Sequence, residues 1–245
     1  MAYSKKKEAS YIAHLDLARV FDRALRRAQI EVAYSEGFNP HPKIAFGPPL
    51  PVGVEGVREY VDIDLKPPES PGTGRSLQEQ EQAFLVEVVA KLQKQLPEGI
   101  ELSDYALRPQ GSKAIMALVN LARYRTQAPF LEAVTSAQLK EACRKWLARE
   151  KIIGVRYKKG KRTERDIRPF VSRIEILSHE NDNKAVMLFD IVTGNAGSVR
   201  PVEVLVSLSE LEELPVDIPG VHTTREGLYI EQPDGTLIDP LEMVK

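Results

Sequence analysis

The clearest pattern along the chain is the helical spacing of apolar residues between positions 14 and 29. Leu17, Phe21 and Leu25 recur every four positions, with other apolar residues three or four positions apart. Asp16 lies in the first turn, where a carboxylate suits the positive end of the helix dipole. Four basic residues fall on the opposite side: Arg19, Arg23, Arg26 and Arg27. The pattern therefore predicts an amphipathic helix with a basic stripe.

The surrounding segments alternate between strand and helix patterns. Strand patterns are found at 30–34, 60–65 and 100–107, and residues 66–74 are rich in proline and glycine, which is typical of a surface loop. Ser76 and Glu79 have the spacing of a capping box, which predicts the start of a second helix. The first half is thus expected to run strand, helix, strand, strand, helix, strand.

A similar order is predicted in the second half. Residues 114–127 are strand-like, and Thr135 with Gln138 forms a second capping-box pattern before a helix. Further strands are expected near 152–157, 170–177 and 185–192. Another helix is expected to begin near Pro201, because proline is favoured in the first turn of a helix.

These elements predict an α+β protein with two ferredoxin-like (split βαβ) halves and mostly antiparallel sheets. The first half spans residues 1–108 and the second spans 114–210, with a junction near 108–113. Residues 211–245 are expected to form an acidic C-terminal extension.

The composition is that of an ordinary globular protein, with 42% hydrophobic and 28% charged residues among 245. No run of about 18 apolar residues is present, so a membrane span is not expected. No apolar segment follows the lysines at positions 5–7, which argues against a signal peptide. We therefore expect a cytoplasmic protein.

The single cysteine, Cys143, limits the chemistry of the chain. One thiol excludes an internal disulfide, a four-cysteine zinc site and an iron–sulfur cluster held by this chain alone. Its position on the apolar stripe with Leu139 and Trp146 favours a buried structural thiol over a nucleophile. We expect neither a cofactor nor a metal site in this chain.

The charged residues are segregated along the chain, although 34 basic and 35 acidic residues nearly cancel. Residues 151–173 contain nine basic and two acidic residues, a charge of +7. Residues 203–245 contain ten acidic and two basic residues, a charge of −8. Such segregation favours a basic surface for a polyanion, whereas the alternative is a solvated hairpin whose lysines only confer solubility.

Residues 34–43 form the densest cluster of unusual residues. Prolines on both sides of His41 stiffen this segment, and it presents other polar groups, including Tyr34, Ser35, Glu36 and Asn39. We therefore predict a stiff loop that binds a substrate or partner.

The candidate chemical groups are His14, Asp16, Glu36 and His41. If they converge, the histidines can act as acid and base, or the four residues can bind a divalent metal. Their spacing matches no metal motif such as H-E-x-x-H. The structural alternative is that His14 caps the first helix and His41 packs in a proline-rich turn.

A basic hairpin is predicted around residues 157–168. Its candidate phosphate contacts are Lys158, Lys159, Lys161, Arg162 and Arg168. Side chains of this kind can follow a phosphate backbone independently of sequence. Arg200, beside the turn at 193–198, is a further candidate for binding a phosphate near a helix start.

Several strings together resemble a known family. The string YSEGFNPHP at 34–42 is highly specific, and 14–19, 23–28, Gly53, 59–63, 158–161, 166–169 and 200–205 continue the likeness over residues 3–208. The chain is similar to the radical-SAM-linked family of uncharacterised proteins. The resemblance implies a protein encoded beside, or fused to, a radical-SAM protein with a B12-type domain.

These observations lead to three functional hypotheses. The first is a non-catalytic accessory protein that recognises RNA, with a radical-SAM partner modifying tRNA or rRNA. The chain is not itself expected to be the radical-SAM enzyme, because it lacks the cysteines for a cluster. The second is a small RNA-processing or RNA-modifying enzyme with His14 and His41 as acid and base. The third is a protein–protein adaptor whose basic surface binds an acidic partner.

Overall fold

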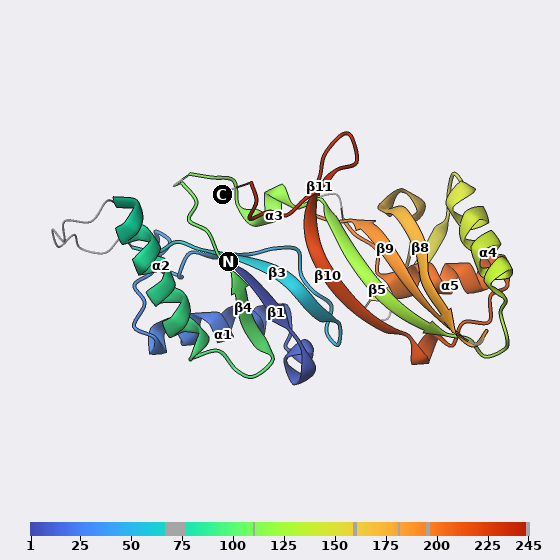
Figure 1. Cartoon of the computed structure of the whole chain (residues 1–245), viewed down its shortest axis with the longest axis horizontal. Coiled ribbons are helices and arrows are strands. Elements are labelled where there is room, and N and C mark those ends of the chain that lie inside the picture. Colours follow the sequence, from blue (N-terminus) through green and yellow to red (C-terminus); the bar gives the residue numbers. More distant parts are fainter. Residues whose placement is uncertain (67–76, 110, 159–160, 181, 195–196, 244–245) are drawn as a thin grey trace. The chain divides into compact units, whose positions relative to one another are not determined.

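The computed structural model divides the chain into two compact units (Figure 1). It describes residues 1–66, 77–109, 111–158, 161–180, 182–194 and 197–243. The first unit contains Met1–Leu118 and Asp239–Lys245, and the second contains Val119–Ile238. Each unit combines helices with an antiparallel sheet, which confirms the predicted α+β class.

The sheet of the first unit has the strand order β4-β1-β3-β2, and every neighbouring pair is antiparallel. Its elements are β1 (Ala2–Lys5), a 3-10 helix (Lys7–Tyr11), α1 (His14–Arg27), β2 (Ile44–Phe46), β3 (Glu55–Ile63), α2 (Leu77–Gln93), β4 (Ile100–Asp104) and α3 (Ile115–Leu118). When the strands are numbered along the chain, they lie in the sheet in the order fourth, first, third, second. Helix α1 precedes the second strand and α2 precedes the fourth.

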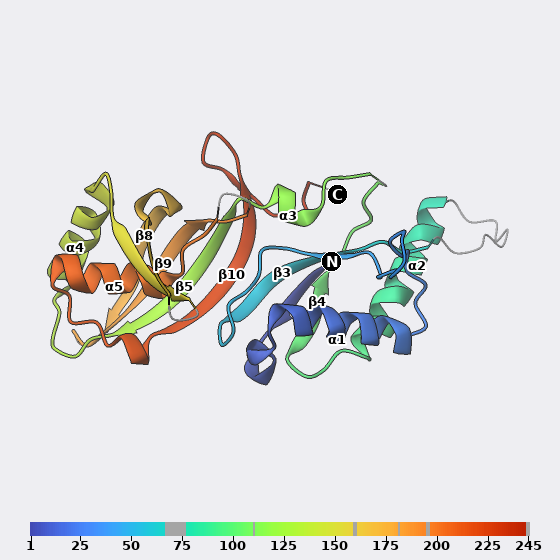
Figure 2. The ribbon, with the colours of Figure 1, turned by 180° about the vertical axis from the view of Figure 1, so that it is seen from behind.

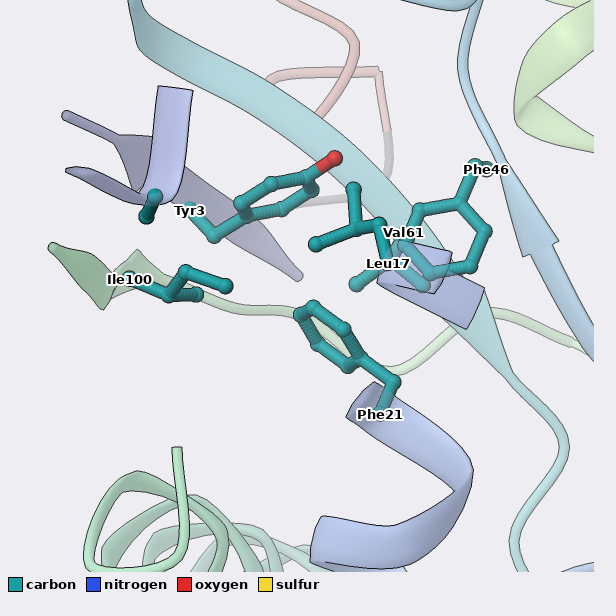
Figure 3. Close-up of a cluster of buried hydrophobic side chains, with 7 residues drawn as sticks. Tyr3, Leu17, Phe21, Phe46, Val61 and Ile100 are labelled. Carbon is teal, nitrogen blue, oxygen red and sulfur yellow. The ribbon is translucent and has the colours of Figure 1, made fainter. Parts of the chain in front are cut away.

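Helix α1 packs on this sheet through the apolar residues that predicted it. Leu17 and Phe21 are buried in one cluster with residues of β1, β2 and β3 (Figure 3). The Phe21 ring meets the rings of Tyr3 and Phe46 edge-on, with centroids 5.4 and 5.3 Å apart. Such edge-to-face pairs contribute stability beyond the burial of their area.

The sheet of the second unit has the strand order β10-β5-β9-β8, again antiparallel throughout (Figure 2). Its elements are β5 (Leu121–Pro129), α4 (Ser136–Ala148), β6 (Ile153–Lys158), β7 (Lys161–Asp166), a 3-10 helix (Arg168–Phe170), β8 (Val171–Glu180), β9 (Lys184–Val192), α5 (Pro201–Glu212), a 3-10 helix (Ile218–Gly220), β10 (His222–Glu231) and β11 (Leu237–Ile238). Strands β6 and β7 form a separate two-stranded hairpin between α4 and β8.

Several local predictions are confirmed. The Thr135 hydroxyl accepts the Gln138 N–H at 3.2 Å, and the Thr135 N–H donates to the Gln138 side chain at 2.8 Å, which completes the capping box of α4. Pro201 is the first residue of α5. The predicted cap at Ser76 lies outside the described residues. In the part of the chain that the structure describes, no helix is long and apolar enough to cross a lipid bilayer.

Two strand predictions are wrong. Residues 30–34 make only isolated bridges, Val32 with Leu65 and Tyr34 with Pro42, and the second strand is β2, which comes after the loop. The loop folds back on itself, so the 44–46 segment takes the place beside β3. Residues 114–127 begin with α3 rather than a strand, because the Asp62 carboxylate accepts the Ile115 N–H at 2.8 Å and holds that turn.

The acidic residues 211–245, which we expected to form an extension, supply β10 and β11. Strand β10 pairs with β5 from His222↔Gln127 to Tyr229↔Leu121. Much of the negative charge of this segment therefore belongs to a sheet strand and its flanking turns.

Candidate functional site

The YSEGFNPHP loop is a closed, hydrogen-bonded turn. The Ser35 N–H donates to the His41 carbonyl at 2.8 Å, and the His41 N–H donates to the Ser35 hydroxyl at 3.0 Å. Gly37 has a φ of +123°, a conformation that side chains resist. Ser35 thus closes the loop, which agrees with the predicted stiffness.

The tip of this loop presents its side chains to solvent. Glu36, Asn39 and His41 are exposed, and Tyr34 is 42% exposed. Phe38 is fully exposed. An aromatic ring held in water by a stiff loop is a natural contact point for a partner. We did not select Phe38 from the sequence, although its place between Gly37 and Asn39 marks it as a loop residue.

Both ends of the loop line a pocket of about 610 Å³ in the first unit. The Lys43 N–H donates to the Ala33 carbonyl and the Ala33 N–H to the Asp64 carbonyl, each at 2.8 Å. The three residues are part of the pocket wall. A volume of this size is in the range of small-molecule sites, and any occupant would contact the base of the loop.

The pocket combines charged and apolar groups. Asp62 and Arg108 form an ion pair at 2.9 Å, with 23% and 18% of their side chains exposed. Leu85 and Leu107 supply apolar surface. The Met1 amino group donates to the Val61 carbonyl at 2.8 Å, and burial lowers its pKa to about 6. None of these pocket residues was selected from the sequence, because they come from distant segments.

His14 and Asp16 lie at the start of α1. The His14 ring packs against Phe46, with centroids 5.7 Å apart, and Asp16 accepts a hydrogen bond from Arg19 at 2.8 Å. Among the described residues, no three His, Cys, Asp or Glu side chains gather in a group that can hold a metal ion. The convergence of His14 and Asp16 with Glu36 and His41 stays a prediction.

The arginine stripe of α1 is partly neutralised by acids of the same helix. Arg19 pairs with Asp16 at 2.8 Å, and Arg26 pairs with Asp22 at 3.0 Å. Arg27 donates to the Gln95 carbonyl at 2.6 Å. Four arginines and two aspartates leave a charge of +2 on this face, which is weaker than the sequence pattern indicated. Arg23 is exposed.

The predicted basic hairpin is formed by β6 and β7, with Arg156 opposite Thr163 and Lys158 opposite Lys161. Lys159 lies outside the described residues. Arg162 forms an ion pair with Glu164 on the same strand at 2.5 Å.

A cluster of three arginines surrounds one carboxylate beside this hairpin. Arg200 donates to Glu203 at 2.9 Å, and Arg156 and Arg165 lie 3.8 and 3.7 Å from the same carboxylate. Three guanidinium groups and one carboxylate give a local charge of +2. We name Arg156, Arg165, Arg200 and Glu203 the arginine cluster. The sequence analysis selected Arg200 but not the other three, because Glu203 lies 47 positions from Arg156 and 38 from Arg165, across the segment between the hairpin and α5.

Arg168, a predicted phosphate contact, is engaged within the fold. Its guanidinium donates to the Leu147 carbonyl at 2.7 Å and to the Val171 carbonyl at 2.7 Å, and lies 5.7 Å from the centre of the Trp146 ring. The arginine therefore caps the last turn of α4. Its role in binding phosphate stays a prediction.

Cys143 is buried, as its place on the apolar stripe predicted. Burial raises the pKa of its thiol to about 12. A thiol in this state is protonated at neutral pH and is a poor nucleophile.

A polar network that the sequence did not indicate holds the chain end to the first unit. Asp239 accepts hydrogen bonds from Arg58 and from the Tyr60 hydroxyl, and Arg58 also donates to Asp104 at 3.0 Å. Burial raises the pKa of Asp239, but the hydrogen bonds from Arg58, the Leu241 N–H and Tyr60 outweigh it, so the pKa is lowered.

Comparisons with known proteins give a family and a distant structural likeness. A search of curated proteins finds no match. In the structure titled "Crystal Structure of a Cbf5-Nop10-Gar1 Complex", one chain is 14% identical, with a TM-score of 0.49 over 99% of this chain and 53% of that one. In "Crystal structure of the archaeal box H/ACA sRNP Nop10-Cbf5 complex", one chain is 11% identical, with a TM-score of 0.44 over 91% of this chain and 46% of that one.

The chain thus spans about half the length of these solved chains. A family model described as "Uncharacterized protein conserved in bacteria (DUF2344)" matches residues 1–201, which include the YSEGFNPHP loop and the arginine cluster up to Arg200. The chain therefore belongs to the DUF2344 family.

Proposed function

We propose that this protein is a non-catalytic, RNA-directed accessory protein that works with a radical-SAM partner in the modification of tRNA or rRNA. The observation that carries the proposal is the arginine cluster, where three guanidinium groups share the single carboxylate of Glu203. A local excess of positive charge beside a basic hairpin attracts a polyanion, and the phosphate backbone of RNA is a polyanion of this kind.

The basic surface of the second unit would bind RNA mainly through phosphates. Aromatic residues make up only 7% of the chain, so extensive stacking on bases is not expected. Recognition would therefore depend on RNA shape and on salt concentration.

The YSEGFNPHP loop would bind the partner or substrate. Its support is the exposed Phe38 ring at the tip and the pocket at its base. The choice of a radical-SAM protein as partner comes from the resemblance of the signature strings. A pull-down with the partner encoded beside the gene, using wild type and F38A, tests it. Equal recovery of the partner with F38A would remove the loop from this role.

We also infer that both units are variants of the ferredoxin-like fold. Each has the strand order fourth-first-third-second, all neighbours are antiparallel, and a helix precedes the second and the fourth strand. The β6–β7 hairpin is an insertion before the second strand of the second unit. Folds of this kind place their helices on one face of an antiparallel sheet.

RNA binding is tested by replacing the hairpin's basic residues together. The K158A/K159A/K161A/R162A variant is expected to bind labelled tRNA at least tenfold more weakly in a filter assay at 100 mM salt, with a shallower dependence on salt. The matched control is K91A/K94A/K140A/K145A, which removes the same charge from exposed sites on α2, directly after it, and on α4. The proposal fails if wild type does not bind RNA, or if both quadruple variants lose the same affinity.

A further inference from the structure

We propose that the arginine cluster is a binding site for one phosphate group of an RNA backbone, and that Glu203 occupies this site in the free protein. The inference rests on the proposed function and adds a specific location and an internal competitor. The three arginines are the residues that bind the phosphate, and the Glu203 carboxylate is the group that the phosphate displaces.

The carboxylate satisfies only one of the three arginines. Glu203 accepts from Arg200 Nη2 at 2.9 Å and Nε at 3.2 Å, and from the Arg200 backbone N–H at 3.0 Å. The nearest nitrogens of Arg156 and Arg165 are 3.8 and 3.7 Å from the carboxylate, which is too long for a hydrogen bond. Two guanidinium groups therefore face the carboxylate without donating to it.

One of these two arginines is held in place by other contacts of its side chain. Arg165 donates to the Ser198 carbonyl, and its guanidinium carbon lies 5.0 Å from the centre of the Phe170 ring. Arg156 is fixed at its backbone, as part of the paired strand β6. A phosphate that enters the site therefore meets at least one guanidinium group that is already positioned, so less conformational entropy is lost on binding.

The site is open to solvent on the arginine side. The side chains of Arg156, Arg165 and Arg200 are 48%, 36% and 45% exposed, whereas that of Glu203 is 11% exposed. The carboxylate is thus less accessible to solvent than the arginines, and an anion from solvent can contact the guanidinium groups directly.

A phosphate group suits this geometry better than a carboxylate does. A carboxylate has two oxygens in one plane, and here both are engaged by Arg200. The two non-bridging oxygens of a phosphodiester accept several hydrogen bonds, and guanidinium groups bind them bidentately. A phosphodiester that displaces the Glu203 carboxylate replaces one negative charge by another, so the local charge stays at +2 and the exchange leaves no guanidinium group without an anionic partner.

The role of the Glu203 carboxylate as a competitor of phosphate is tested with the E203Q variant. Glutamine keeps an oxygen that can accept the Arg200 backbone N–H, as a capping box with Gln does, so the start of α5 is retained. The negative charge that opposes the phosphate is lost. We expect E203Q to bind labelled tRNA about tenfold more tightly than wild type at 100 mM salt.

The matched control is E212Q on the same helix. Glu212 pairs with Arg149 at 2.7 Å, away from the cluster, and its loss changes the total charge of the protein equally. E212Q is expected to change the affinity for tRNA less than twofold. If E212Q increased the affinity for tRNA as much as E203Q does, the effect would be one of net charge only, and the proposed site would be wrong.

The contribution of the binding arginines is tested with R156A and R165A. The control is R144A, because Arg144 is also paired with a glutamate, Glu141, but lies on the exposed face of α4. Each cluster variant is expected to weaken tRNA binding about fivefold and to reduce the salt slope by about one, with no change in R144A. Competition with inorganic phosphate, with a 20-base-pair RNA duplex and with poly-glutamate identifies the anion that binds. The duplex should compete best.

The results separate the two proposals. If wild type binds tRNA but E203Q, R156A and R165A all bind like wild type, this site is wrong and the RNA-directed function stands. If wild type does not bind RNA, both fail. Equal competition by poly-glutamate and duplex RNA overturns the phosphate assignment and favours an acidic protein. Circular dichroism spectra that match wild type confirm that each variant is folded.

Discussion

The hydrogen bond between Trp146 and Ser207 allows a quantitative prediction about the core of the second unit. The Trp146 indole N–H donates to the Ser207 hydroxyl at 2.8 Å, and the hydroxyl in turn donates to the Val204 carbonyl at 2.8 Å. Trp146 is fully buried and Ser207 is 4% exposed. Ser207 thus links α5 to α4 through a contact that water cannot replace.

Replacing Ser207 with alanine removes the acceptor and leaves the indole N–H buried without a partner. Leaving such a donor unsatisfied costs about 1–3 kcal/mol. Alanine is the better helix former and returns about 0.4 kcal/mol. The free energy of unfolding of the second unit should therefore fall by about 0.6–2.6 kcal/mol.

Ser209 provides the control, because it lies two positions further along α5 and is only half-buried. The S209A change carries the same helix-propensity gain without orphaning the indole, so its free energy of unfolding should rise slightly. Trp146 is the only tryptophan of the chain, so urea unfolding followed by its fluorescence reports this core directly. Equal stabilities of S207A and S209A would refute the reasoning.

Three further predictions concern single residues. Cys143, with its pKa raised to about 12, should resist iodoacetamide at pH 8 in the native protein and react fully in urea; rapid native alkylation would contradict its burial. G99A should lower the free energy of unfolding by about 1–3 kcal/mol, because Gly99 has a φ of +86° and a Cβ there would lie 2.3 Å from the Lys6 carbonyl oxygen; an unchanged urea midpoint would contradict this. Because the pKa of Asp239 is lowered by its partners, its contribution is present at pH 7 and is lost as the pH falls below about 4. D239N should therefore lower Tm at pH 7 much more than at pH 3, and an equal loss at both would exclude the charged hydrogen bonds with Arg58.

The local features of the fold were predictable from the sequence. Helical spacing located α1, and the capping box of Thr135 and Gln138 located the start of α4, because both depend on residues three or four positions apart. The strand predicted at 30–34 is wrong, because a local pattern does not show which segment pairs with β3. Its apolar and β-branched residues resemble a strand, but the partner that decides pairing, β3, lies across the loop and accepts β2 instead.

The candidate sites show the same difference between features set by neighbouring residues and features that depend on distant contacts. The stiff loop at 34–42 was recognised from its prolines and glycine, and its hydrogen bonds agree with that prediction. The charge of the α1 stripe was overestimated, because Asp16 and Asp22 lie one turn from arginines and pair with them. The arginine cluster was not recognisable, since a list of basic residues does not show which of them share a carboxylate.

Local sequence patterns were sufficient to predict helices α1, α2, α4 and α5, the buried thiol and the stiff loop, because short-range sterics and the burial of one apolar face govern them. Helix α3, the strand that pairs with β3, the residues that line the pocket and the arginines that surround Glu203 became clear only in the folded chain. These depend on contacts between segments tens of residues apart. Their geometry arises when the sheet closes and brings separate side chains to within a few ångströms of one another.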